Sequence, residues 1–163
     1  MLKYIDSKVV FNEVPDEITL AINISGCPIG CPDCHSKYLW KDEGKELTIK
    51  ELEKLIDDNW GITCISFMGG DSDPEEVAKL AEFIKDKYER RIKTAWYSGN
   101  NGFYPTISIR NFDFIKFGPF IKERGPITNK NTNQVMYEIM HIFDGNNYYD
   151  KISNITYKFW KKD

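Results

Sequence analysis

The chain has 163 residues, which is long enough for one compact domain with a full core and short for two. Its net charge is −3, with 29% charged residues of both signs mixed along the sequence, so no nucleic-acid or membrane surface is indicated. No apolar run approaches the roughly 20 residues that span a bilayer, and the N-terminus lacks the apolar block of a signal peptide. We therefore expect a single soluble domain over residues 1–163 in the cytoplasm, where thiols stay reduced.

The first part of the chain is predicted to contain two strands and one helix. Strand-forming residues run over Tyr4–Phe11 and Ile18–Ile24, and the segment NEVPDE between them is rich in turn-forming residues. Thr48 followed by Glu51 three residues later is typical of a capping box. We therefore expect a helix from Thr48 to about Asp58, with its apolar residues on one face.

The second part is predicted to alternate strands with a helix. The apolar run Cys64–Gly70 is typical of a buried parallel strand. Asp73, followed by a proline and two glutamates, starts a helix that its apolar spacing extends to about Tyr88. Two further strands are expected over Lys93–Gly99 and Phe112–Phe120.

The order of these elements predicts βα units on a mostly parallel, open sheet, and hence an α/β domain. Sheets of this kind bind ligands at the C-terminal ends of their strands. The cysteine-rich loop after residue 24 and the segments GGD, YSG and GPF each follow an expected strand. We expect these four segments to converge at one edge of the sheet.

Three of the four cysteines, Cys27, Cys31 and Cys34, follow the spacing C-x3-C-x2-C. Structural zinc normally takes four protein ligands in two separated pairs. A zinc site here therefore needs a fourth ligand, and His35 is the candidate. Cys64 opens an apolar strand and is expected to point into the core as a small hydrophobe.

An iron–sulfur cluster is the other interpretation of this spacing, and the one we favour. Thiolate ligands select such clusters, and a four-iron cluster usually takes four cysteines. Three ligands leave one iron open for a small molecule. Gly26 and Gly30 permit backbone bends beside the cluster, and the free amides of the loop can point at its sulfides.

The sequence resembles the radical S-adenosylmethionine (SAM) superfamily, which is marked by C-x3-C-x2-C. Within it, the chain resembles the activating proteins of anaerobic ribonucleoside-triphosphate reductase. The segments that carry this resemblance occur in family order between about residues 15 and 140, and they are CHSKYLW, FMGGDSDP, WYSG, FDFIKFGPFI and TNKNTNQVMYEI. Lys116 and Phe117 depart from the acidic residue that the family usually has before its Gly-Pro pair.

The resemblance implies a fold and an activity. The fold is an abbreviated partial (β/α) barrel of radical SAM type, because the chain is too short for the complete barrel of about 250 residues. The activity is reductive cleavage of SAM by a [4Fe-4S] cluster, giving a 5′-deoxyadenosyl radical that makes a glycyl radical on the large subunit of the anaerobic reductase. A flavodoxin-like protein is the implied electron donor.

The resemblance also implies the site residues. The metal ligands are Cys27, Cys31 and Cys34, and the SAM contacts are Asp33, His35, Gly69, Gly70, Asp71 and Ser98. Asp33 stands where many radical SAM proteins have an aromatic residue, so contact through the backbone of Asp33 and His35 is expected. Asp71 either binds the methionine ammonium or caps the following helix, where Asp73 competes with it.

Two other functions fit the sequence. One is a different small radical SAM enzyme that acts on a metabolite or a peptide. The other is a zinc-stabilised binding module that uses the three clustered cysteines and His35.

Overall fold

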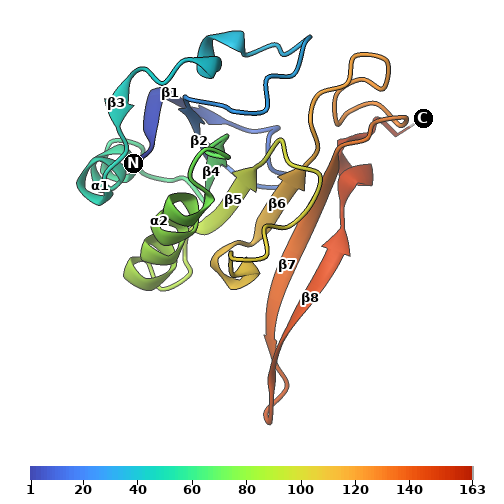
Figure 1. Cartoon of the computed structure of the whole chain (residues 1–163). Coiled ribbons are helices and arrows are strands. Elements are labelled where there is room, and N and C mark those ends of the chain that lie inside the picture. The colour runs from blue at the N-terminus through green and yellow to red at the C-terminus, as the bar shows by residue number, and fades with distance from the viewer. Residues whose placement is uncertain (163) are drawn as a thin grey trace.

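The computed structural model describes residues 1–162. Eight strands form one sheet in the order β3-β1-β2-β4-β5-β6-β7-β8 within this part of the chain (Figure 1). The strands are β1 Lys3–Val10, β2 Thr19–Ile24, β3 Lys45–Glu46, β4 Cys64–Met68, β5 Lys93–Tyr97, β6 Phe114–Phe117, β7 Val135–Phe143 and β8 Tyr148–Asn154. The helices are α1 Ile49–Asp57 and α2 Pro74–Lys87, with short 3-10 turns η1 Lys37–Trp40, η2 Ile109–Asn111 and η3 Thr156–Phe159.

The sheet is mixed, whereas the sequence predicted a mostly parallel one. Strands β2, β4, β5 and β6 are parallel to one another. On one side β1 pairs antiparallel with β2 and β3 antiparallel with β1, and on the other side β7 pairs antiparallel with β6 and β8 antiparallel with β7. The crossover from β5 to β6 carries only the short turn η2. With two α-helices within residues 1–162 and two open edges, the sheet does not resemble a partial (β/α) barrel, which needs a helix after each strand.

The hairpin of β7 and β8 was not predicted from the sequence. It extends beyond the rest of the sheet (Figure 1). Its turn is closed by Asp144, whose carboxylate accepts hydrogen bonds from the backbone N–H groups of Asn146 and Asn147. The sequence signal was the Asp-Gly pair at this turn, which is typical of hairpins.

Both α-helices pack on the same face of the sheet (Figure 1). The predicted caps are confirmed: Thr48 Oγ1 accepts from Glu51 N at 3.1 Å, and Asp73 Oδ1 accepts from Glu76 N at 3.2 Å. Side-chain acceptors at these positions satisfy amides that would otherwise lack a partner at the helix start.

Two apolar cores lie on opposite faces of the sheet. The larger one packs α1 and α2 against inward residues of the parallel strands, such as Ile22, Phe67 and Trp96. The smaller one contains Cys64, which is fully buried with Ala95 and Phe114 and is covered by residues from three loops. The prediction that Cys64 is a small buried hydrophobe is therefore confirmed.

One row of side chains crosses all four parallel strands near their C-terminal ends. Asn23, Met68, Tyr97 and Lys116 are paired in register. Met68 lies four residues after Cys64, and Tyr97 and Lys116 lie two residues after Ala95 and Phe114, which all belong to the smaller core. Because side chains alternate between the two faces along a strand, the row lies on the face of the smaller core, away from the helices. Among residues 1–162, no helix is both long and apolar enough to cross a lipid bilayer.

Candidate iron–sulfur site

A cavity of about 200 Å³ lies at the C-terminal ends of the parallel strands. The cross-strand row of Asn23, Met68, Tyr97 and Lys116 lines it. The other lining residues come from the cysteine loop and from the segments after β4, β5 and β6, and they include Cys27, Cys31, Cys34, Gly69, Asp71, Ser98, Gly118 and Gln134. The four segments that were expected to converge therefore do so.

The cysteine loop places three free thiols around this cavity. Cys27, Cys31 and Cys34 are all partly exposed and form no disulfide. Cys27 N donates to Leu39 O at 3.0 Å, and Ser36 N donates to the Sγ of Cys34 at 3.3 Å. These hydrogen bonds fold the loop back on η1 and give one thiol an amide donor.

Backbone amides also face the first thiol of the loop. Burial raises the pKa of Cys27, while hydrogen bonds from the amides of Ile29 and Gly30 act in the opposite direction. Gly30 has φ +62°, a conformation that glycine adopts without strain. Amide donors aimed at a sulfur stabilise its thiolate form, and the thiolate is the form that binds metal.

The surroundings of the thiols and of His35 bear on the zinc interpretation. Within residues 1–162, no three His, Cys, Asp or Glu side chains are gathered closely enough to hold one metal ion. His35, the candidate fourth zinc ligand, is exposed and packs edge-on against Phe120 with ring centroids 4.8 Å apart. The three thiols of a cubane site bind three different irons and need not meet at one point.

Asp71 is buried at the edge of the cavity and is held by three donors. Its carboxylate accepts from the hydroxyl of Ser98, from Gly99 N at 2.9 Å and from the hydroxyl of Tyr104 at 2.9 Å. Asp73 caps α2, whereas the donors to Asp71 come from the segment after β5. The choice that the sequence left open for Asp71 is settled against the helix cap.

The remaining predicted SAM contacts divide into two groups. Gly69 lines the cavity with φ +105°, and a Cβ there would lie 3.1 Å from Ile24 O. Gly70 is outside the lining, and a Cβ on it would lie 2.5 Å from Val77 Cγ2, so it lets α2 approach the sheet. Asp33 and His35 are exposed, and their side chains do not line the cavity.

Lys116 is the main residue of the site that sequence reasoning missed. Its side chain is buried, donates to Gly118 O at 3.1 Å and lies over the ring of Tyr97 at 5.6 Å. Burial lowers the pKa of Lys116 to about 8, against the opposing effect of negative charge on Asp71 and Cys31. The signal for it was a lysine inside the apolar strand FIKF.

Three clustered thiols at the ligand-binding edge of an α/β sheet are the kind of donor set that iron–sulfur clusters use. Comparison with known families agrees, because the 4Fe-4S single cluster domain matches residues 18–120, more than half of the chain. The chain belongs to this family. No curated protein and no solved structure shows significant similarity to it.

Proposed function

We propose that this iron–sulfur protein is a SAM-dependent activating enzyme that generates a glycyl radical on the large subunit of an anaerobic ribonucleoside-triphosphate reductase. The observation that carries the proposal is the shared cavity of Cys27, Cys31, Cys34, Asp71 and Ser98. When bound, the reduced [4Fe-4S] cluster supplies one electron for cleavage of SAM to methionine and the 5′-deoxyadenosyl radical, which abstracts a hydrogen atom from glycine.

The cysteines hold the cluster in this proposal, and the opposite wall of the cavity orients SAM. Asp71 Oδ2 accepts one hydrogen bond, from Gly99 N, so it keeps an acceptor position for the methionine ammonium. Gly69 allows the methionine to approach the backbone, since no Cβ projects there. Lys116 places a buried positive charge at the same cavity, which offsets the negative charge of a thiolate-bound cluster.

An open site also favours a protein substrate. The cavity volume of about 200 Å³ is below the roughly 300–1,000 Å³ of pockets that enclose a whole ligand. A molecule of the size of SAM therefore extends out of it toward solvent, where a glycine-bearing loop of a large partner has access. A flavodoxin-like donor in the cytoplasm is the proposed source of the electron.

Anaerobic reconstitution tests the proposal. The expected result is a brown protein with four irons per chain that cleaves SAM under dithionite and, mixed with the reductase large subunit, produces a glycyl radical signal in electron paramagnetic resonance. Stoichiometric zinc without SAM cleavage would show the zinc-stabilised module instead. SAM cleavage without a radical on the reductase would show a radical SAM enzyme with another substrate.

A further inference from the structure

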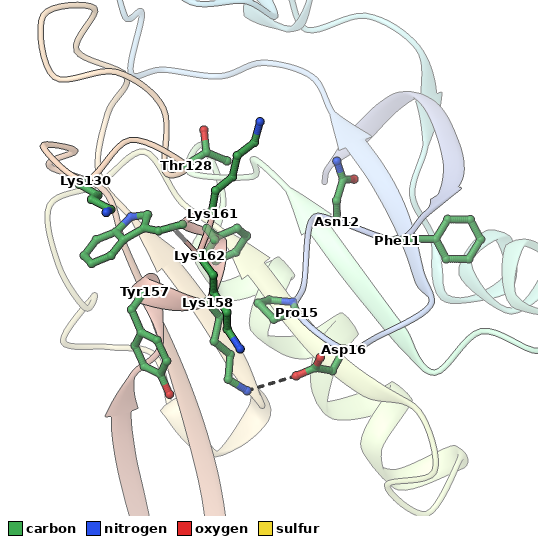
Figure 2. A pocket seen from close by; sticks show the side chains of 12 residues that line it. Phe11, Asn12, Pro15, Asp16, Thr128, Lys130, Tyr157, Lys158, Lys161 and Lys162 are labelled. Atoms are coloured by element: carbon green, nitrogen blue, oxygen red, sulfur yellow. Dashed lines mark hydrogen bonds and ion pairs between the residues drawn. The ribbon is translucent and has the colours of Figure 1, made fainter.

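A second, larger cavity of about 800 Å³ lies beside the smaller core and is lined mainly by lysine and aromatic side chains (Figure 2). It is built from residues 11–16, from the loop around residue 128 and from residues 157–162. Phe159 of this group packs against the smaller core, which anchors the cavity to the sheet. None of its lining residues lines the cavity that contains Cys27, Cys31 and Cys34 (the cysteine cavity).

Lysines outnumber carboxylates in the described lining of this cavity, although the whole chain has a net charge of −3. The described carboxylate is that of Asp16. Lys158 Nζ pairs with Asp16 Oδ2 at 3.2 Å, as the dashed line in Figure 2 shows. Lys161 and Lys162 are exposed and form no ion pair within residues 1–162, so their ammonium groups are available to an anion.

Aromatic rings accompany these lysines. The Tyr157 side chain is 60% exposed, and Tyr157 and Trp160 line both this cavity and a neighbouring one of about 460 Å³. Trp160 is partly exposed. Accessible aromatic rings beside lysines are the elements that bind a flat base and its phosphates, since bases stack on rings and ammonium groups pair with phosphate oxygens.

We propose that this cavity binds a nucleotide, with its base on Tyr157 and Trp160 and its phosphates on Lys158, Lys161 and Lys162. The cavity volume lies within the range of about 300–1,000 Å³ for small-molecule sites, which favours a nucleoside polyphosphate over an acidic polypeptide. The site stands independently of the proposed activase function, because it shares no lining residue with the cysteine cavity.

Calorimetric titration of the anaerobically purified, cluster-containing protein with ATP tests this site. The variant Lys161→Glu/Lys162→Glu is expected to bind ATP at least about tenfold more weakly, because two attractive charges become repulsive. The control Lys8→Glu/Lys50→Glu makes the same change in net charge at two exposed lysines outside the cavity and is expected to bind normally. Iron content is measured on the same samples. Weaker ATP binding at unchanged iron content then reports on this cavity and not on loss of the cluster.

The contribution of the base is tested at Tyr157. Tyr157→Ala is expected to weaken ATP binding about tenfold, and Tyr157→Phe to retain it, since stacking needs the ring and not the hydroxyl. A single-stranded oligo-dT tested in parallel distinguishes a polynucleotide source, shown by tighter binding than ATP, from a free nucleotide. Absence of ATP binding at millimolar concentration overturns the proposal. So does binding of tripolyphosphate as tight as ATP, or tight binding of a glutamate-rich peptide alone.

Discussion

The hydroxyl of Ser98 donates a hydrogen bond to the carboxylate of Asp71, across the C-terminal ends of β5 and β4. Both side chains are buried, with exposures of 0% and 8%. Gly99 N and Tyr104 complete the set of donors, so the carboxylate is fixed before any ligand arrives. A carboxylate that is held in this way orients a bound cation without a further loss of side-chain entropy.

Asp71→Asn therefore tests the cavity wall without touching the cysteines. The amide replaces an acceptor oxygen with a donor, which faces either Gly99 N–H or the two hydroxyls. We expect normal iron content and a loss of SAM cleavage of at least tenfold. The control is Asp73→Asn, two residues away, which keeps a good helix cap and should leave cleavage unchanged. Equal loss in both variants would contradict the role assigned to Asp71.

Contact between Gly99 and the cysteine loop gives a second prediction. A Cβ on Gly99 would lie 2.8 Å from Ile29 Cγ1, whereas a Cβ on Gly102 would have no neighbour within 4 Å. Gly99→Ala is expected to displace the loop and to speed loss of the cluster to a chelator several-fold, and Gly102→Ala to have no effect. Trimming the partner in Gly99→Ala/Ile29→Ala should restore the original rate. Absorbance of the cluster over time measures all three variants, and a double variant as labile as Gly99→Ala would refute the steric explanation.

Single cysteine substitutions separate the cluster ligands from the buried thiol. Alanine at Cys27, Cys31 or Cys34 should abolish iron and sulfide binding, because each removes one thiolate. Cys64→Ala should retain both, because that thiol is fully buried in the smaller core and does not line the cavity of the other three cysteines. Its expected cost is about 1 kcal/mol of unfolding free energy, from the lost packing of one atom. Full iron content in any of the first three variants would overturn the ligand assignment.

A buried carboxylate outside the site predicts the acid stability of the fold. Glu51 accepts from the hydroxyl of Tyr4 at 2.5 Å and pairs with Lys45 at 2.5 Å. The hydrogen bond from Lys45, followed by that from Tyr4, lowers the pKa of Glu51. Its stabilising effect is therefore complete above the unfolded value of about 4.3 and is lost as pH falls through the lower, folded value.

Glu51→Gln should accordingly lower the unfolding free energy at pH 7 by about 1–3 kcal/mol. The difference from the wild type should shrink below about pH 4, where the wild-type carboxylate also becomes protonated. Urea unfolding at several pH values measures both effects. Asp58→Asn removes an exposed pair with Lys54 and should change little. A stability difference between Glu51→Gln and the wild type that grows as pH falls would contradict the lowered pKa of Glu51.

Local signals predicted the helices and the parallel strands well. The caps at Thr48 and Asp73 act within one turn of chain, so the sequence contains both partners of each hydrogen bond. The pairing of β7 with β6 was missed because it joins segments that are separated by a long loop, whereas the adjacent hairpin of β7 and β8 had a local signal in its Asp-Gly turn that was not used. Contacts between segments that are distant in sequence decide whether the strands added at the edge of the sheet are parallel or antiparallel to their neighbours.

The candidate site was also predicted only in part, because some of its residues are brought together by tertiary structure. The spacing of Cys27, Cys31 and Cys34 lies within eight residues and indicates metal chemistry by itself. Lys116 and Tyr104 were missed, since their positions at the cavity and at Asp71 depend on strand register and on the loop after β5. Gly70 was predicted to contact SAM, but its lack of a side chain is needed for the packing of Val77.

By itself, the sequence determined the cysteine loop, the helix starts and the order of strands that brings ligands to one edge, because these follow from short-range spacing. Only the tertiary structure decided which acid caps α2 and which faces the cavity. It also gathered lysines from residues 130 to 162 beside Phe11 and Asp16. The charge and burial of a site depend on which distant segments fold together. The composition and net charge of the whole chain do not contain that information.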